Sequence, residues 1–183
     1  MTLRHSHDPV IQAYIDHLNG LLNATISDSR LVLLEVDGGS DQKHIGRFQD
    51  RRLPLELDPS GFLHFRQLVH RVEDHVEVTQ AIYVFSHSED PDDEDAWVFR
   101  YEYDRLPEPT KPQSHLHVNA ERSGKSIRHI HFPTSRISVE QLIAHLIMEH
   151  DISSARDDWR DFLGASHQGF VKRRTDSQTG AFP

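Results

Sequence analysis

Two short His-x-His pairs carry the clearest chemistry in this sequence. His115 and His117 form the first pair and His129 and His131 the second, within the segment SHLHVNAERSGKSIRHIHFP. Because strand side chains alternate between two faces, both members of each pair share a face if the segment is extended. A turn centred on residues 123–124 would place His115 opposite His131 and His117 opposite His129. The pattern therefore predicts four imidazoles on one surface of an antiparallel β-hairpin.

Four clustered imidazoles suit acid–base chemistry without a cofactor. Imidazole titrates near neutral pH, so histidines on either side of a phosphodiester can remove a 2′-hydroxyl proton and protonate the leaving oxygen. Such a reaction needs cations to hold the phosphate, and Arg100, Arg105 and Arg128 lie close in sequence. The first hypothesis is therefore a metal-independent endoribonuclease in which Arg128 and Arg105 contribute to binding RNA.

The same four histidines are alternative ligands for a divalent transition metal. Imidazole nitrogens bind zinc, nickel, copper and iron. A carboxylate ligand would come from Glu102, Asp104 or Glu121. The spacing of His115, His117 and Glu121 echoes the first metal motif of cupins, although no second cupin motif follows at suitable spacing. This alternative predicts a cupin-like metalloenzyme.

Composition limits the class of protein. The chain has 183 residues, which suits one domain, and it has no cysteine, which excludes disulfides, thiolate zinc sites and cysteine nucleophiles. It carries 20 Lys and Arg against 29 Asp and Glu, a net charge of −9 that argues against a broad nucleic-acid surface. Six of these acids fall in residues 89–95, so the sheet face with the histidines can still be locally positive.

The N-terminal residues lack the apolar stretch of a signal peptide, and no run of apolar residues is long enough to span a bilayer. We therefore expect a cytoplasmic protein that has no membrane partner.

Hydrophobic periodicity predicts an α+β fold. The expected helices span residues 9–23, 138–150 and 153–163, the first two with capping signals at Asp8-Pro9 and at residues 138–141. The expected strands span residues 30–36, 51–57, 62–72, 76–85 and 96–103, followed by the two histidine strands. We expect a single domain over residues 1–163, a mainly antiparallel sheet of five or six strands, and a weakly ordered tail over residues 164–183.

The central strands also carry a recognisable order of motifs. A Tyr-x-Phe strand (Tyr83, Phe85) precedes an acidic turn, the segment VFRYE at residues 98–102, a proline-containing loop, and then Pro-x-x-His-x-His ending at His117. Over residues 76–120 this order resembles the TumE-like toxins of bacterial toxin–antitoxin pairs. The chain departs from that family at Glu102, where the family has Asp.

The resemblance implies a small α+β toxin of a bacterial toxin–antitoxin or defence system. Its implied functional residues are Arg100, Tyr101, Glu102, His115 and His117. It implies growth inhibition by a nucleic-acid-directed activity and a cognate antitoxin protein as partner.

A third hypothesis is a non-enzymatic interaction module, in which the acidic loop or the basic residues 172–174 bind a protein partner. A homo-oligomer is compatible with any of the three.

Overall fold

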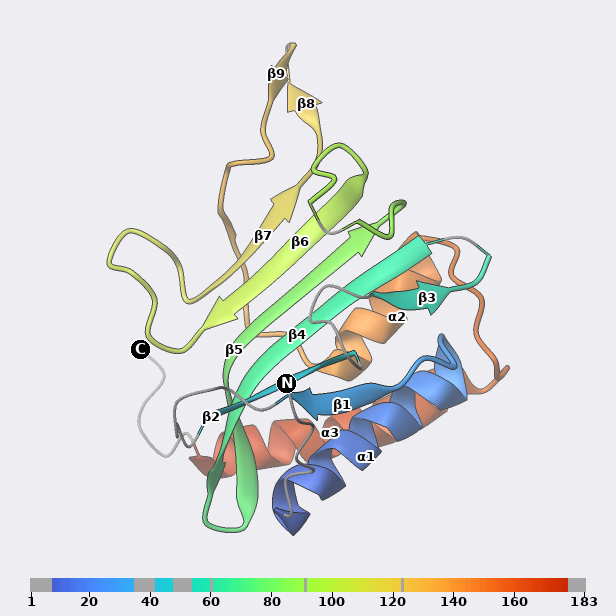
Figure 1. The fold of residues 1–183 in the computed structure, drawn as a ribbon, viewed down its shortest axis with the longest axis vertical. Coiled ribbons are helices and arrows are strands. Elements are labelled where there is room, and N and C mark those ends of the chain that lie inside the picture. The colour runs from blue at the N-terminus through green and yellow to red at the C-terminus, as the bar shows by residue number, and fades with distance from the viewer. Residues whose placement is uncertain are drawn as a thin grey trace.

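Over its described residues the protein has one main antiparallel sheet, a small separate hairpin and three helices (Figure 1), which confirms the predicted α+β class. The computed structural model describes residues 8–34, 42–47, 54–59, 61–90, 92–122 and 124–177. The helices are α1 (Pro9–Thr25), α2 (Val139–Glu149) and α3 (Trp159–Ser177). The strands are β1 (Leu31–Leu34), β2 (Gln42–Arg47), β3 (Leu55–Leu57), β4 (Gly61–Val72), β5 (His75–Ser86), β6 (Trp97–Asp104), β7 (Ser114–Val118), β8 (Glu121–Arg122), β9 (Lys125–Ser126) and β10 (Phe132–Pro133).

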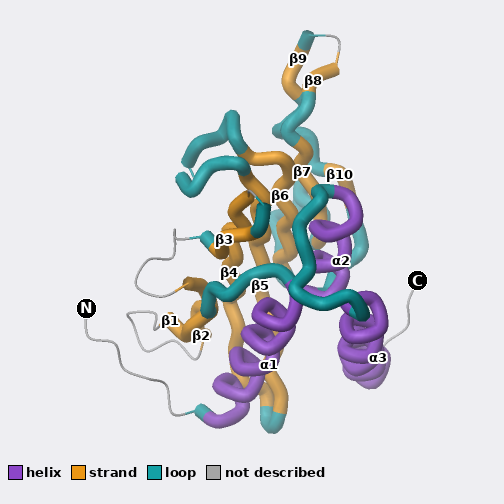
Figure 2. Tube along the Cα trace, turned by 90° about the vertical axis from the view of Figure 1, so that its right-hand side faces the viewer, coloured by secondary structure: helices purple, strands orange, loops and turns teal. Residues whose placement is uncertain are grey.

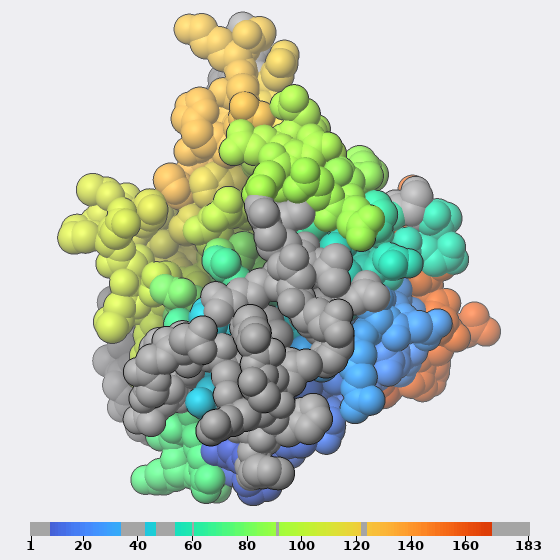
Figure 3. Space-filling model, viewed as in Figure 1, coloured from blue at the N-terminus to red at the C-terminus, as the bar shows by residue number. Residues whose placement is uncertain are grey.

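The main sheet has eight strands rather than the five or six expected. Its order is β1-β2-β4-β5-β6-β7-β10, and β3 pairs with β4 on the same edge as β2. The strands β4 to β7 form the antiparallel meander that the short connections predict. The short strands β8 and β9 form a separate hairpin that projects from one end of the molecule (Figure 3).

All three helices cover one face of the sheet (Figure 2), and the core lies between them and that face. In β6, Phe99, Tyr101 and Tyr103 are buried on the helix side, whereas Arg100 and Glu102 alternate onto the other face. The two faces of this one strand therefore belong to two different environments, the core and the opposite surface of the sheet.

Local signals locate two of the helices correctly. Asp8 caps α1 by accepting hydrogen bonds from the backbone N–H groups of Val10 and Ile11, at 2.9 and 3.3 Å. Ser138 and Gln141 form the predicted capping box of α2. These caps satisfy backbone donors that would otherwise have no partner at the helix ends.

The bounds predicted for the last helix are wrong. The helix begins at Trp159 rather than at residue 153, because the preceding backbone is bonded elsewhere: Ser153 N–H donates to Asp58 and Ala155 N–H to Thr25. It then continues to Ser177, so residues 164–177 are helical, whereas the expected weak order of residues 164–183 stays a prediction. Residues 178–183 lie outside the described residues. In the part of the chain that is described, no helix is both long and apolar enough to cross a membrane.

A buried carboxylate joins the three helices. Glu140, in the first turn of α2, is 5% exposed, accepts a hydrogen bond from Ser166 of α3 at 2.5 Å and lies 3.9 Å from His17 of α1. Burial alone would raise the pKa of Glu140, but the interactions with His17, Ser166 and Ser138 lower it to about 2. The ionised form therefore stabilises the folded state.

Replacing Glu140 by Gln should lower the free energy of unfolding at pH 7 by about 2–3 kcal/mol. The pKa of this carboxyl is lower in the folded chain than its ordinary 4.5, so its stabilisation is complete above about pH 4.5 and is lost as pH falls toward 2. Urea unfolding at pH 7, 5 and 3 should show the gap between the two proteins closing as pH falls. The exposed Glu149 of the same helix provides the control substitution, Glu149→Gln. An equal gap at pH 7 and pH 3 would contradict the prediction.

Candidate metal centre

Pairing between β6 and β7 brings two histidines and a carboxylate together. His115 pairs with Glu102 and His117 pairs with Arg100, while Leu116 between them pairs with Tyr101 and packs against the core. Since Tyr101 and Leu116 face the helices, the two histidines project from the opposite face of the sheet. The first His-x-His pair therefore shares a face, as the sequence predicts.

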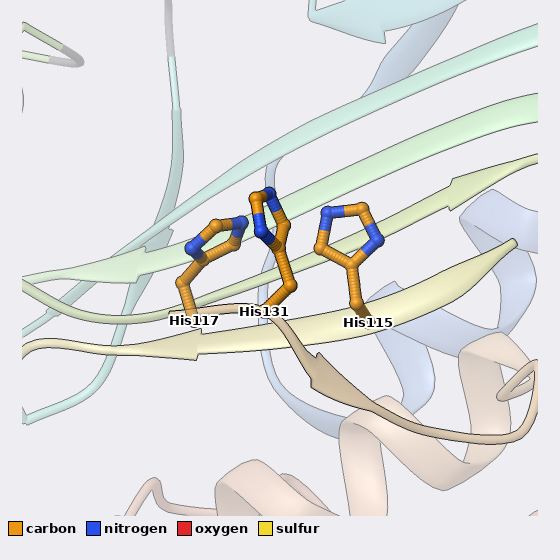
Figure 4. A group of neighbouring side chains, drawn as sticks. All are labelled: His115, His117 and His131. Atoms are coloured by element: carbon orange, nitrogen blue, oxygen red, sulfur yellow. The ribbon is translucent and has the colours of Figure 1, made fainter. Parts of the chain in front are cut away.

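Three histidines meet on this face (Figure 4), and we call His115, His117 and His131 the histidine triad. Each offers one ring nitrogen, and these nitrogens all lie within 4.8 Å of one another. The ring centroid of His131 is 4.6 Å from each of the other two, which are 5.1 Å apart. Three imidazole nitrogens at this spacing can bind one transition-metal ion.

Backbone carbonyls fix the orientation of two of the rings. Nδ1 of His115 lies 3.1 Å from the Pro112 carbonyl oxygen, and Nδ1 of His117 lies 2.9 Å from that of Arg128. A carbonyl only accepts, so each Nδ1 carries the hydrogen and each Nε2 remains for another role. Histidines that bind metals commonly have this arrangement, because the second hydrogen bond fixes the ring and makes the ligand nitrogen more basic.

The Nε2 atom of His115 is buried without a hydrogen-bond partner in the described residues. The side chain is 3% exposed, and the nearest carboxylate oxygen, Oε2 of Glu102, is 3.5 Å from Nε2. A deprotonated Nε2 and a carboxylate oxygen are both acceptors, so they repel each other unless a proton or a cation lies between them. The other oxygen of Glu102 is held by Nε of Arg100 at 2.5 Å.

His117 has the protonation behaviour that a ligand requires. Burial lowers its pKa below the usual range, although its hydrogen bond to the Arg128 carbonyl acts in the opposite direction. The ring is therefore neutral at neutral pH, and a neutral imidazole is the form that binds metals.

The fourth predicted histidine lies outside the triad. His129 is exposed in a turn at residues 127–130, where Ile130 N–H donates to the Ile127 carbonyl at 2.9 Å. The predicted antiparallel register is also wrong, since Pro133, not His131, pairs with His115. The observed pairing is shifted by two residues from the predicted pairing. Because side chains alternate every residue, a shift of two leaves His131 on the predicted face. The strands β8 and β9 pair antiparallel on either side of Gly124, whose φ is 72°, whereas residue 123 of the predicted turn lies outside the described residues.

Two predicted phosphate-binding arginines have acidic partners away from the triad. Arg128 reaches Asp95 at 3.2 Å and Glu94 at 3.6 Å in the acidic loop, and Arg105 forms an ion pair with Glu77. Only the backbone carbonyl of Arg128 contributes to the triad.

Other predicted residues also lie elsewhere. Tyr101 is buried on the helix side, where its hydroxyl oxygen accepts a hydrogen bond from Ile137 N–H at 3.1 Å. Asp104 accepts hydrogen bonds from the side-chain amide of Gln80 and from the backbone N–H of Leu106. Glu121 is exposed on β8 and is not part of the triad, so the cupin spacing does not describe this site.

No family model, curated protein or solved structure matches this chain. The resemblance to TumE-like toxins therefore stays a prediction.

Proposed function

We propose that this protein is a metalloenzyme that binds one divalent transition-metal ion at the histidine triad. The observation that carries the proposal is the buried, unpartnered Nε2 of His115, whose Nδ1 hydrogen is given to a backbone carbonyl. A cation between this nitrogen and Glu102 would satisfy both acceptors at once. Imidazole ligands suit zinc, copper, iron and nickel.

Three protein nitrogens are the number found in many catalytic zinc sites, where a fourth position holds water or substrate. A bound ion of this kind lowers the pKa of its water and polarises a substrate oxygen. Glu102, oriented by Arg100, lies beside the triad, where it would supply either a fourth ligand or a base. This arrangement supports hydrolytic chemistry better than it supports proton transfer by histidines alone.

The charges around the site favour the metal over the metal-independent ribonuclease. That mechanism needs cations that hold phosphate, yet Arg128 and Arg105 lie against carboxylates elsewhere. Arg100 lies across from His117 on the neighbouring strand, and its guanidinium is paired with Glu102. A metal ion supplies the positive charge that these arginines do not bring to the triad.

Tag-free protein that has been stripped with a chelator should bind one equivalent of zinc or cobalt(II). We expect a dissociation constant on the order of a micromolar or tighter by calorimetry, and a cobalt(II) spectrum typical of four-coordinate nitrogen and oxygen ligands. Elemental analysis after extensive dialysis would check the stoichiometry. If zinc, cobalt, nickel and copper all fail to bind stoichiometrically, the proposal fails, and a proton shared by His115 and Glu102 becomes the better account.

A further inference from the structure

A pocket with both polar and apolar walls lies on the other side of β6 from the histidine triad. It is formed by α1, the helix-facing side of the sheet and the residues that lead into α2. Its polar lining residues include Tyr14, Gln67, Tyr83, Tyr101, Arg136 and Glu140. Leu18, Leu21 and Val78 supply apolar walls. The triad and the pocket share no residue.

A short hydrogen-bond chain fixes the direction of the Tyr83 hydroxyl. Tyr14 O–H donates to the side-chain oxygen of Gln67 at 2.9 Å, so the amide nitrogen of Gln67 donates to the Tyr83 oxygen at 2.7 Å. Tyr83 is 2% exposed, and its oxygen already accepts a bond. Its own proton therefore remains to be donated, and no acceptor for it is found in the described residues. Gln67, which links the two tyrosines, is itself buried on the helix-facing side of β4.

The hydroxyl of the neighbouring Tyr101 also has a donor without an acceptor in the described residues. Its oxygen accepts a hydrogen bond from Ile137 N–H, and its side chain is 2% exposed. No acceptor for the hydroxyl proton is found in the described part of the chain. The rings of Tyr83 and Tyr101 are nearly parallel, with centroids 5.8 Å apart. Each hydroxyl therefore has one hydrogen bond as an acceptor and one donor left over, and two such donors in one pocket match a ligand with acceptor oxygens.

Charged groups line the same pocket. The guanidinium of Arg136 lies 4.5 Å from the centroid of the Tyr103 ring. Burial raises the pKa of Tyr83 well above its usual range, and the positive charge of Arg136 acts in the opposite direction. The Tyr83 hydroxyl therefore stays protonated and able to donate. Glu140, which interacts with Ser166 and His17, contributes a negative charge to the lining.

We propose that this pocket binds a small molecule through a carboxylate group, which accepts from the Tyr83 and Tyr101 hydroxyls and pairs with Arg136. A carboxylate has two oxygens and only accepts, so it matches two hydroxyl donors and a guanidinium. A carboxylate is present in both a simple aliphatic acid and an amino acid, and the ammonium group of an amino acid would lie toward Glu140. This proposal does not depend on a metal at the triad.

Calorimetry and backbone amide NMR on the metal-free full chain would test it with propionate, L-alanine and propionamide. Propionate or L-alanine should bind saturably at one site and shift the amide signals of pocket residues, whereas neutral propionamide should bind at least about 10-fold more weakly. Tighter binding of L-alanine would assign an amino-acid ligand, and tighter binding of propionate a simple acid.

The variants Tyr83→Phe and Tyr101→Phe remove one hydroxyl each, and each should lower the affinity for the acid about 10-fold. If either variant fails to fold, the comparison of acid with amide in the unmodified protein still decides. Absence of binding by both acids, equal binding of propionate and propionamide, or full affinity in both Phe variants would overturn the proposal and leave a pocket filled by water.

Discussion

Replacing His131 by Gln should weaken zinc binding by about 100-fold or more, because it removes one of three nitrogens from the triad. His131 is the best position for this test. It is only partly buried, so a substitution there disturbs packing less than one at the buried His115. Calorimetric titration with zinc, supported by cobalt(II) spectra, would measure the change.

The matched control lies two residues away in the same His-x-His pair. His129 is exposed and outside the triad, so His129→Gln should change zinc affinity by less than about 2-fold. Both variants remove one imidazole from the same segment and differ only in whether that ring reaches the triad. Similar losses in the two variants would mean that zinc binds histidines on the surface generally, and the triad would lose its special role.

A second large effect is expected in the core. Phe85→Ala should lower the free energy of unfolding by about 3–5 kcal/mol, as is usual when a fully buried aromatic ring is deleted. Phe85 is 1% exposed, and its ring centroid lies 5.9 Å from that of Phe99 and 4.8 Å from that of His150. It also lies directly over Gly61, where an added Cβ would come within 2.6 Å of the ring. The ring therefore joins β4, β5, β6 and the end of α2.

Urea unfolding followed by circular dichroism would measure this loss, with Phe132→Ala as the control. Phe132 is 38% exposed at the edge of the sheet, so its truncation should cost less than about 1 kcal/mol. A loss of comparable size at Phe132 would show that the core has been assigned to the wrong residues.

The features that the sequence predicts well are those set by short-range patterns. Caps at Asp8 and Ser138 locate two helices, and alternation in β6 correctly separates Tyr101 and Tyr103 from Arg100 and Glu102. The same alternation places His115 and His117 on one face.

Features that depend on distant partners could not be predicted in this way. His129 is excluded from the triad because residues 127–130 turn instead of extending, and the start of α3 is delayed by bonds from residues 153 and 155 to Asp58 and Thr25. The pocket was missed because its donors come from β4, β5, β6 and the segment before α2, which no motif connects. A buried Gln67 within an otherwise apolar strand face was the one local sign of it.

The shortness of β10 has a consequence for how the molecule behaves among copies of itself. β1 and β10 end the strand order, and exposed sheet edges are templates on which other chains can add strands and aggregate. β10 has only two residues, and one of them, Pro133, has no N–H to donate to an incoming strand. The edge nearest the histidine triad is thus poorly suited to intermolecular β-pairing, which protects this end of the sheet from aggregation while the triad remains on its surface.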